Sequence, residues 1–235
     1  MIISIILKFL IAHLIGDFLF QPDIWVKEKL KHKVKSKYLY FHILVHTVAL
    51  LLIFQFQYLP YLVLIIISHY LVDLAKIYFT KKRNRNYLFI LDQILHIGII
   101  LIVSYLIQPY SFPIEINNFY LLLVVFLILT TYTSSVIVKL IVGKWNKEVD
   151  FKHKSINGAG KFIGILERLF VFSFVLLDTW SAIGFLITAK SVFRFGDLNE
   201  GKNRKLTEYV LIGTLLSFGL AILLGITFNY LARFL

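Results

Sequence analysis

Residues 10–21 read "LIAHLIGDFLFQ", a stretch that is almost entirely hydrocarbon but places His13 and Asp17 four positions apart. That spacing puts both side chains on one face of a helix, one turn apart. A single histidine and carboxylate in an apolar helix are more often a hydrogen-bonded pair than a ligand set. The rest of the chain decides whether this pair is isolated.

The apolar character of this stretch extends over the whole chain. Of 235 residues, 59% are hydrophobic and the mean hydropathy is +0.80, whereas soluble domains are about 45–50% apolar. We therefore expect an integral membrane protein. The absence of cysteine excludes disulfides, thiolate metal ligands and a cysteine nucleophile. The N-terminal segment lacks the small-residue cleavage site of a signal peptide and is interpreted as a retained first span.

Six segments are apolar over about the 20 residues that a bilayer-spanning helix needs. A further apolar run, 161–195, is too long for one straight span, and we interpret it as a broken helix pair or re-entrant hairpin with a break near 178–181. The predicted fold is an all-α polytopic membrane protein of about seven or eight helices, with a four-helix domain over 1–107 and a C-terminal helical region over 119–235 packed on it. The six spans are 2–21, 38–55, 58–79, 87–107, 119–142 and 206–232.

Positive charge is concentrated in alternate connections. The formal net charge is +12, yet the connections 56–60 and 108–118 contain no lysine or arginine. This positive-inside pattern predicts a multi-pass protein with cytoplasmic basic loops and an outside N-terminus, in contact with membrane lipid. Nucleic-acid binding is not expected, because no DNA-binding motif appears. Nucleotide binding at "SINGAGK", residues 155–161, is not expected either, because this stretch lacks phosphate-loop spacing and a preceding strand. The basic connections are 26–37, 81–85, 144–161 and 190–205.

The connection 22–37 is short and rich in lysine. We expect an interfacial helix there, with Trp25 and Leu30 towards lipid and the lysines towards the headgroups.

Each of the first four predicted spans carries one i, i+4 pair of ionisable side chains. Counted from the cytoplasmic span ends, all pairs lie at one depth, about 6–15 Å below the boundary. Ionisable groups in hydrocarbon are costly unless they are paired or coordinated, and imidazole with carboxylate is a ligand set for zinc, manganese or iron. We therefore predict a divalent-metal site with one ion and a second shell, or two ions. These residues, called the His/Asp layer, are His13, Asp17, His42, His46, His69, Asp73, Asp92 and His96.

Three further polar side chains lie near the same depth and are candidate catalytic residues. An amide or ammonium there would bind substrate or stabilise developing negative charge, although each is equally consistent with an interfacial anchor or a hydrogen-bond bridge. They are Gln21, Lys76 and Gln93.

A second group of charged residues lies in or beside the apolar segments of the C-terminal region. One interpretation is a set of structural ion pairs that hold the broken helix pair to the last span, with Lys190 and Arg194 extending to headgroups. The other is a cationic pocket for a lipid phosphate or another anion. The last span also carries small residues suited to close packing, Gly213, Ser217 and Gly225. The charged group is Glu167, Arg168, Asp178, Lys190, Arg194 and Glu208.

The motifs "AHLIGDFLFQ", "SHYLVDLAK" and "LDQILH", with the two histidines of "FHILVH", span roughly residues 5–100. They resemble an uncharacterised bacterial integral-membrane family, a domain of unknown function, and "GILER", "AKSVFRF" and "EYVLIGTLLS" resemble the tail of its members. A more distant similarity is to membrane-bound, predicted metal-dependent hydrolases regulated by the SOS repressor. The resemblance implies the His/Asp layer as the shared site and a bacterial cytoplasmic (inner) membrane location, but no substrate.

Three functions fit these observations. The leading hypothesis is a membrane-embedded metal-dependent hydrolase acting on a lipid or other amphiphile near the cytoplasmic leaflet, because a metal there polarises a carbonyl or phosphoryl oxygen and activates water. A proton- or metal-ion transporter is the first alternative, but it should have polar residues along a whole path, and here they stop in the inner half of the spans. The second alternative is a non-catalytic membrane protein with a fully coordinated structural metal. The oligomeric state does not follow from the sequence.

Overall fold

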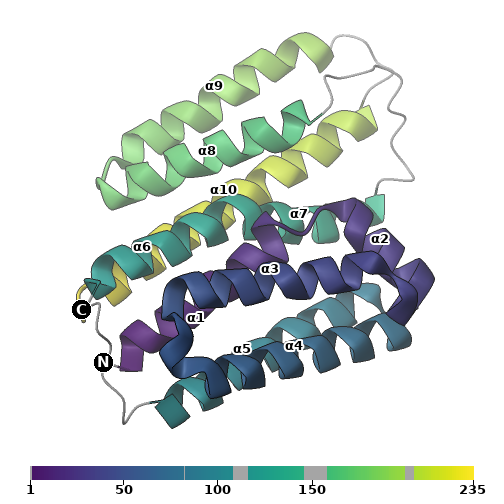
Figure 1. Ribbon diagram of the computed structural model, residues 1–235. Coiled ribbons are helices and arrows are strands. Elements are labelled where there is room, and N and C mark those ends of the chain that lie inside the picture. The colour runs from purple at the N-terminus through teal and green to yellow at the C-terminus, as the bar shows by residue number, and fades with distance from the viewer. Residues whose placement is uncertain (1, 82, 108–115, 146–157, 199–203) are drawn as a thin grey trace. The chain divides into compact units, whose positions relative to one another are not determined.

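The computed structural model describes residues 2–81, 83–107, 116–145, 158–198 and 204–235, with side chains at all of these positions except 57, 193–198 and 204. The regular elements in these ranges are all helices (Figure 1). This confirms the predicted all-α class. Six described helices are long and apolar enough to cross a membrane, in agreement with the predicted spans: Ile2–Leu19, Lys37–Phe54, Leu59–Phe79, Arg85–Ile107, Asn118–Trp145 and Lys205–Ala232.

The chain forms two compact units, Met1–Val125 and Phe126–Leu235. In the first unit, α1 packs on α3 and α5, and α4 packs on the same two helices, so the four close into a ring (Figure 1). Only residues 55–58 connect α3 to α4, and so short a connection favours antiparallel neighbours. The elements of the ring are α1 (Ile2–Leu14) with the π-helix η1 (Ile15–Leu19), α3 (Lys37–Phe54), α4 (Leu59–Phe79) and α5 (Arg85–Ile107).

Apolar side chains fill the ring on one side of the His/Asp layer. Phe9 and Phe54 stack there with ring centroids 4.2 Å apart, and Leu62 and Ile107 are fully buried beside them. The outer faces of the helices are also apolar, since large side chains such as Leu52 are exposed. Apolar surface of this extent is unusual for a soluble monomer and fits contact with lipid.

A short helix, α2 (Asp23–His32), packs on α3 and α4, as expected for a helix within 22–37. Trp25 is partly buried and stacks on Tyr38, with ring centroids 5.8 Å apart. The prediction that the lysines of this helix all face headgroups is wrong for Lys29. Lys29 is only 2% exposed, because its ammonium group forms a buried ion pair with Asp73.

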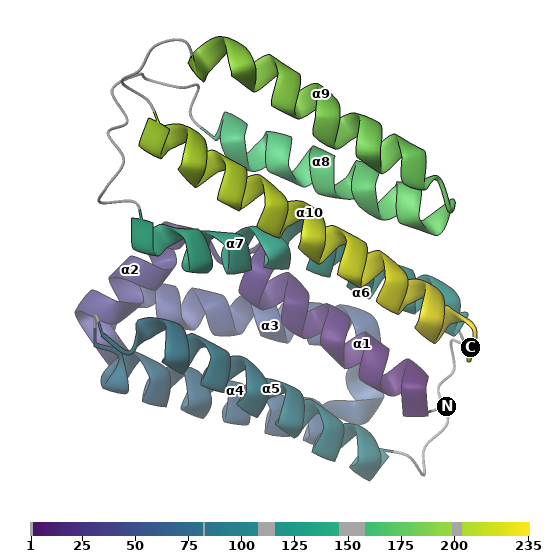
Figure 2. The ribbon, with the colours of Figure 1, turned by 180° about the vertical axis from the view of Figure 1, so that it is seen from behind.

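The second unit begins within α6 (Asn118–Ile128), which continues through the π-helix η4 (Leu129–Thr133) into α7 (Ser134–Val142). The run 161–195 is divided as predicted: α8 (Ala159–Leu176) ends before Asp178, which has a left-handed φ of 55°. The next two helices both pack on α8 (Figure 2), and they are α9 (Trp180–Leu198) and α10 (Arg204–Ala232).

Gly225 allows α10 to approach α8 closely. A Cβ atom added there would lie 2.8 Å from Cβ of the buried Val175, whereas one added at Gly213 or Gly219 has no atom of the described residues within 4 Å. The close contact predicted for Gly225 is therefore present, and the one predicted for Gly213 is absent.

Replacing Gly225 by alanine is expected to destabilise the second unit by about 1–3 kcal/mol, because Val175 or the α10 backbone must move. Gly219→Ala on the same helix is the matched control, and it should be neutral or slightly stabilising, since alanine is the better helix former. Thermal unfolding of the purified variants in detergent compares the two. Equal melting temperatures would contradict the close approach.

Candidate metal centre

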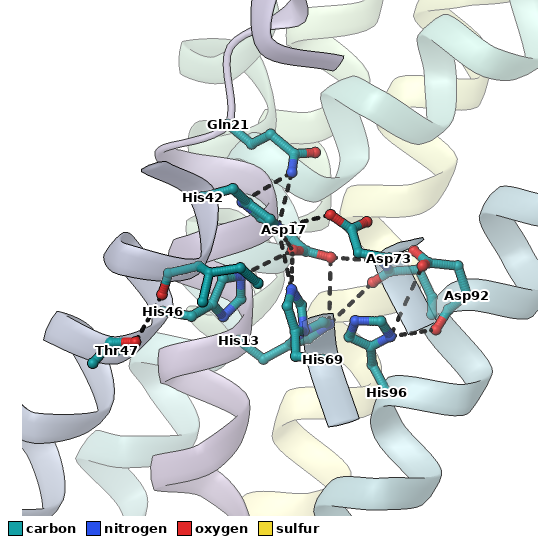
Figure 3. Close-up of polar contacts among 12 residues, drawn as sticks. His13, Asp17, Gln21, His42, His46, Thr47, His69, Asp73, Asp92 and His96 are labelled. Carbon is teal, nitrogen blue, oxygen red and sulfur yellow. Dashed lines mark hydrogen bonds and ion pairs between the residues drawn. The ribbon is translucent and has the colours of Figure 1, made fainter. Parts of the chain in front are cut away.

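The four predicted pairs converge on one place inside the ring of the first unit (Figure 3). All of these side chains are buried, with exposed fractions of 7% or less. Residues up to 83 positions apart in the sequence thus come together through the packing of four helices. The members are His13 on α1, Asp17 on η1, His42 and His46 on α3, His69 and Asp73 on α4, and Asp92 and His96 on α5.

Asp17 lies at the centre of this cluster. Its Oδ1 is 3.1 Å from Nε2 of His46, 3.2 Å from Nε2 of His42 and 3.6 Å from Nε2 of His69. The Nε2 atoms of His42 and His69 are 3.1 Å apart. Each of the four residues offers a ligand atom within 4.8 Å of the others. They make up one compact donor set.

The spacing of this donor set is compatible with a bound metal ion. Tetrahedral donors at the usual zinc–nitrogen distance are about 3.3 Å apart, close to the separations around Asp17. Three imidazoles and a carboxylate suit zinc, manganese or iron.

The charges around the donor set also favour a cation. Lys29 Nζ lies 2.6 Å from Asp73 Oδ2, and Lys76 Nζ lies 2.6 Å from Asp92 Oδ2. These two ammonium groups balance two of the three buried carboxylates, so that with neutral imidazoles one negative charge, that of Asp17, remains. A buried uncompensated charge is costly, and a bound divalent ion would remove that cost. Because Asp73 and Asp92 are paired with lysines, we assign these two carboxylates a supporting role and not metal ligation.

The three predicted catalytic candidates all lie against the His/Asp layer. Gln93 Nε2 donates to Asp17 Oδ2 at 2.9 Å and to Asp92 at 3.1 Å, while its Oε1 lies 3.2 Å from Nε2 of His13. Gln21 Nε2 lies 3.0 Å from Nδ1 and 3.1 Å from Nε2 of His42. Through its hydrogen bond to Asp17, Gln93 can orient a ligand side chain, as outer-shell groups of metal sites do. Lys76 is the most exposed of the ionic groups here, at 21%.

Gly16 provides the space that the His46 ring occupies. A Cβ atom at position 16 would lie 2.2 Å from His46 Nε2. Gly16 belongs to η1, where Phe20 N–H bonds to the carbonyl of Ile15 in the i→i+5 pattern of a π-helix, at 3.0 Å. Such turns are frequent at functional sites. Sequence reasoning missed this residue, although a glycine between a histidine and an aspartate is a visible signal.

Lys29 is a second residue that the sequence analysis missed, and its ion pair can be tested. Lys29→Met would remove the 2.6 Å partner of the buried Asp73 carboxylate and leave it with Lys76 and His42 at 3.7 Å, so we expect a loss of up to about 3–5 kcal/mol of stability. Lys31→Met is the matched control, because Lys31 is exposed on the same helix. Unfolding in detergent gives both values. Similar stability of the two variants would contradict the buried pair.

The charged side chains that the structure describes in the second unit do not gather into one pocket. Arg168 is 3% exposed and donates to the carbonyls of Thr130 and Thr131 at 2.7 and 2.8 Å, as well as to Ser217 Oγ at 2.9 Å and to Ser135 Oγ. Two of these four partners are backbone carbonyls of η4, which Arg168 thereby satisfies. This contact set favours the structural interpretation for Arg168.

The remaining members of that group are distributed over α8, α9 and α10. Lys190 Nζ pairs with Glu167 at 2.6 Å, and the exposed Asp178 accepts from Nε1 of Trp180 at 2.6 Å. Glu208 is exposed on α10, and the side chain of Arg194 lies outside the described residues. The Glu167–Lys190 pair joins α8 to α9, as the ion-pair interpretation requires.

Comparison with protein families matches residues 5–125 to a family described as "Protein of unknown function (DUF3307)". The matched stretch contains the whole His/Asp layer and all four helices of the ring. No curated protein and no solved structure gives a significant match, and the similarity to SOS-regulated hydrolases stays a prediction. Because the match covers more than half of the 235 residues, the chain belongs to the DUF3307 family.

Proposed function

We propose that this protein is a membrane-embedded, metal-dependent hydrolase that acts on a lipid or other amphiphile near the cytoplasmic leaflet. One observation carries the proposal: Nε2 atoms from two helices surround a single carboxylate oxygen of Asp17, deep among helices apolar enough to cross a membrane. Ionisable groups in such a setting are rare and usually functional.

The residues have distinct roles in this proposal. Asp17, His42, His46 and His69 would hold one divalent ion, zinc, manganese or iron, which when bound polarises a carbonyl or phosphoryl oxygen and activates water. Gln93 fixes the Asp17 carboxylate through its Oδ2. Its hydrogen bond leaves Oδ1 directed at the histidines.

Lys76 is suited to meet the substrate. It is the partly exposed ammonium group at the edge of the layer, and a cation there stabilises negative charge that develops on a reacting oxygen. The carboxylate of Asp92, 2.6 Å from Lys76 Nζ, orients this group.

The position of the layer along the helices supports action at the cytoplasmic side. The layer extends from the middle of each helix towards the start of α3, the end of α4 and the start of α5, and the basic connections 26–37 and 81–85 adjoin the same ends. By the positive-inside rule these ends face the cytoplasm. An amphiphile in that leaflet would place its polar group at the depth of the layer.

A structural metal is the second candidate, favoured by a specific observation. The four residues of the donor set already supply as many ligands as a tetrahedral structural zinc site uses. In that case the ion would stabilise the ring of helices and would have no position for water.

Lipid turnover in vesicles tests the proposal. Full-length protein reconstituted with phospholipid and an isoprenoid phosphate should release product only in the presence of a divalent metal, and His46→Ala should lower the rate by at least about 100-fold, since removing a metal ligand removes the metal's chemistry. Lys31→Met is the control for reconstitution. A metal-loaded protein that turns over neither lipid class supports the structural metal, and metal flux into the same vesicles without turnover would indicate the transporter.

A further inference from the structure

A small cavity adjoins the donor set on the side of the His/Asp layer away from Gln21 and Lys76. Its volume is about 20 Å³, enough for one water molecule, which needs about 10–15 Å³ measured in this way. Residues of all four ring helices line it. The lining residues that lie one turn beyond the layer, such as Phe9 and Ile100, are apolar, and the polar ones are His13, His46, Ser68, His69 and His96.

His96, which lines this cavity, has an unused hydrogen-bond acceptor. Its Nδ1 lies 2.8 Å from the carbonyl oxygen of Asp92, and because a carbonyl only accepts, Nδ1 carries the ring hydrogen. Nε2 therefore has a free lone pair. Among the described residues it has no hydrogen-bond partner, although His96 is 96% buried. Buried polar atoms are rarely left in this state, and an ordered water is the usual partner.

His96 lies beside the donor set without belonging to it. Its ring is perpendicular to that of His69, with centroids 4.0 Å apart, yet it is not among the four residues whose ligand atoms gather within 4.8 Å. A second divalent ion in the cavity is disfavoured by charge. The ion in the donor set already changes the net charge of the buried groups from one negative to one positive charge. A neutral molecule or a hydroxide ion meets no such penalty.

We propose that this cavity is a water site, in which one water or hydroxide donates its hydrogen to His96 Nε2 and lies next to the ion held by Asp17 and its three histidines. The inference rests on the proposed metal site. It gives that site an open position on its membrane-core side, which a structural metal would lack. The reacting group of the substrate would then approach from the opposite side, past Gln21 and Lys76.

Oxygen-17 labelling tests the site directly. The full-length protein in detergent is loaded with Mn²⁺ and transferred to H₂¹⁷O, and electron–nuclear double resonance then detects water in contact with the ion. We expect a ¹⁷O coupling in the wild type. His96→Phe, which fills the cavity and removes Nε2, should retain Mn²⁺ but lose the coupling. Ser104→Ala, a buried position on the same helix that does not line the cavity, should keep both.

The outcomes separate the two proposals. Wild-type protein that binds Mn²⁺ without a ¹⁷O coupling, or His96→Phe protein that keeps the coupling, overturns the water site and leaves the metal site intact. Loss of Mn²⁺ in His96→Phe overturns the placing of His96 outside the donor set. Wild-type protein that binds no Mn²⁺, zinc or iron overturns both. If His96→Phe does not fold, His96→Leu removes the same acceptor with a smaller side chain, and the wild-type measurement stands alone.

Discussion

Replacing His46 by alanine is expected to remove the metal from the purified protein. His46 Nε2 is the donor closest to Asp17 Oδ1, at 3.1 Å. Its loss leaves the ion with two imidazoles and the Asp17 carboxylate. Substitutions of outer-shell residues alone lower metal affinity by about 10–100-fold, so a ligand should count for more than about 100-fold. Elemental analysis of wild type and variant, purified side by side, measures the effect.

Two further variants make this result specific. His32→Ala is the matched control, because His32 is an exposed histidine on α2 that pairs with Glu28, at 3.3 Å. It should retain the wild-type metal content. Gln93→Ala, which removes the hydrogen bond to Asp17 Oδ2, should give an intermediate loss of about 10–100-fold. Equal metal in His46→Ala and wild type, or a wild type that contains no transition metal, would contradict the site.

Helical periodicity and hydrophobicity account for the part of the fold that the sequence predicts. Hydrophobic length locates the six apolar helices, and the i, i+4 spacing gives the face and depth of each pair. The spacing does not predict which residue on another helix each of these side chains contacts. Asp17 lies 3.9 Å from His13, its neighbour in the motif, but 3.1 Å from His46 on another helix. These cross-helix distances depend on how the helices rotate against one another.

Lys29 shows why local pattern was insufficient in α2. Lysines alternate through this helix, at 27, 29 and 31, so no helical face is distinguished by polarity. The contacts of α2 with α3 and α4 select the face that turns inward. A residue that looks like its neighbours in sequence thus becomes the counter-ion of Asp73. The π-helix η1 could not be predicted from the sequence either. A π-turn contains one residue more than an α-turn, and a hydrophobic pattern analysed at 3.6 residues per turn does not reveal it.

Replacing Gly16 by alanine is expected to disrupt the metal site through a single methyl group. The new Cβ would lie 2.2 Å from Nε2 of His46 and 2.3 Å from its Cε1, so the buried ring must move by more than 1 Å, as judged from ordinary van der Waals contact of about 3.5 Å. That displacement takes Nε2 away from Asp17. We expect metal affinity to fall by at least about tenfold, as for other substitutions that misplace a ligand. Metal titration of the purified variant provides the measurement.

Gly98→Ala separates this effect from a general effect of alanine in an apolar helix. Gly98 lies on α5 in the same unit, and in the part of the chain that the structure describes an added Cβ meets no atom within 4 Å. Its replacement should leave metal affinity unchanged and should stabilise the helix by up to about 1 kcal/mol. If Gly16→Ala binds metal as tightly as Gly98→Ala, the His46 ring does not occupy the space over Gly16. If Gly16→Ala loses metal while its melting temperature stays near that of the control, the role of Gly16 is to keep the His46 ring in its ligand position. A general loss of packing would lower the melting temperature as well as the metal affinity.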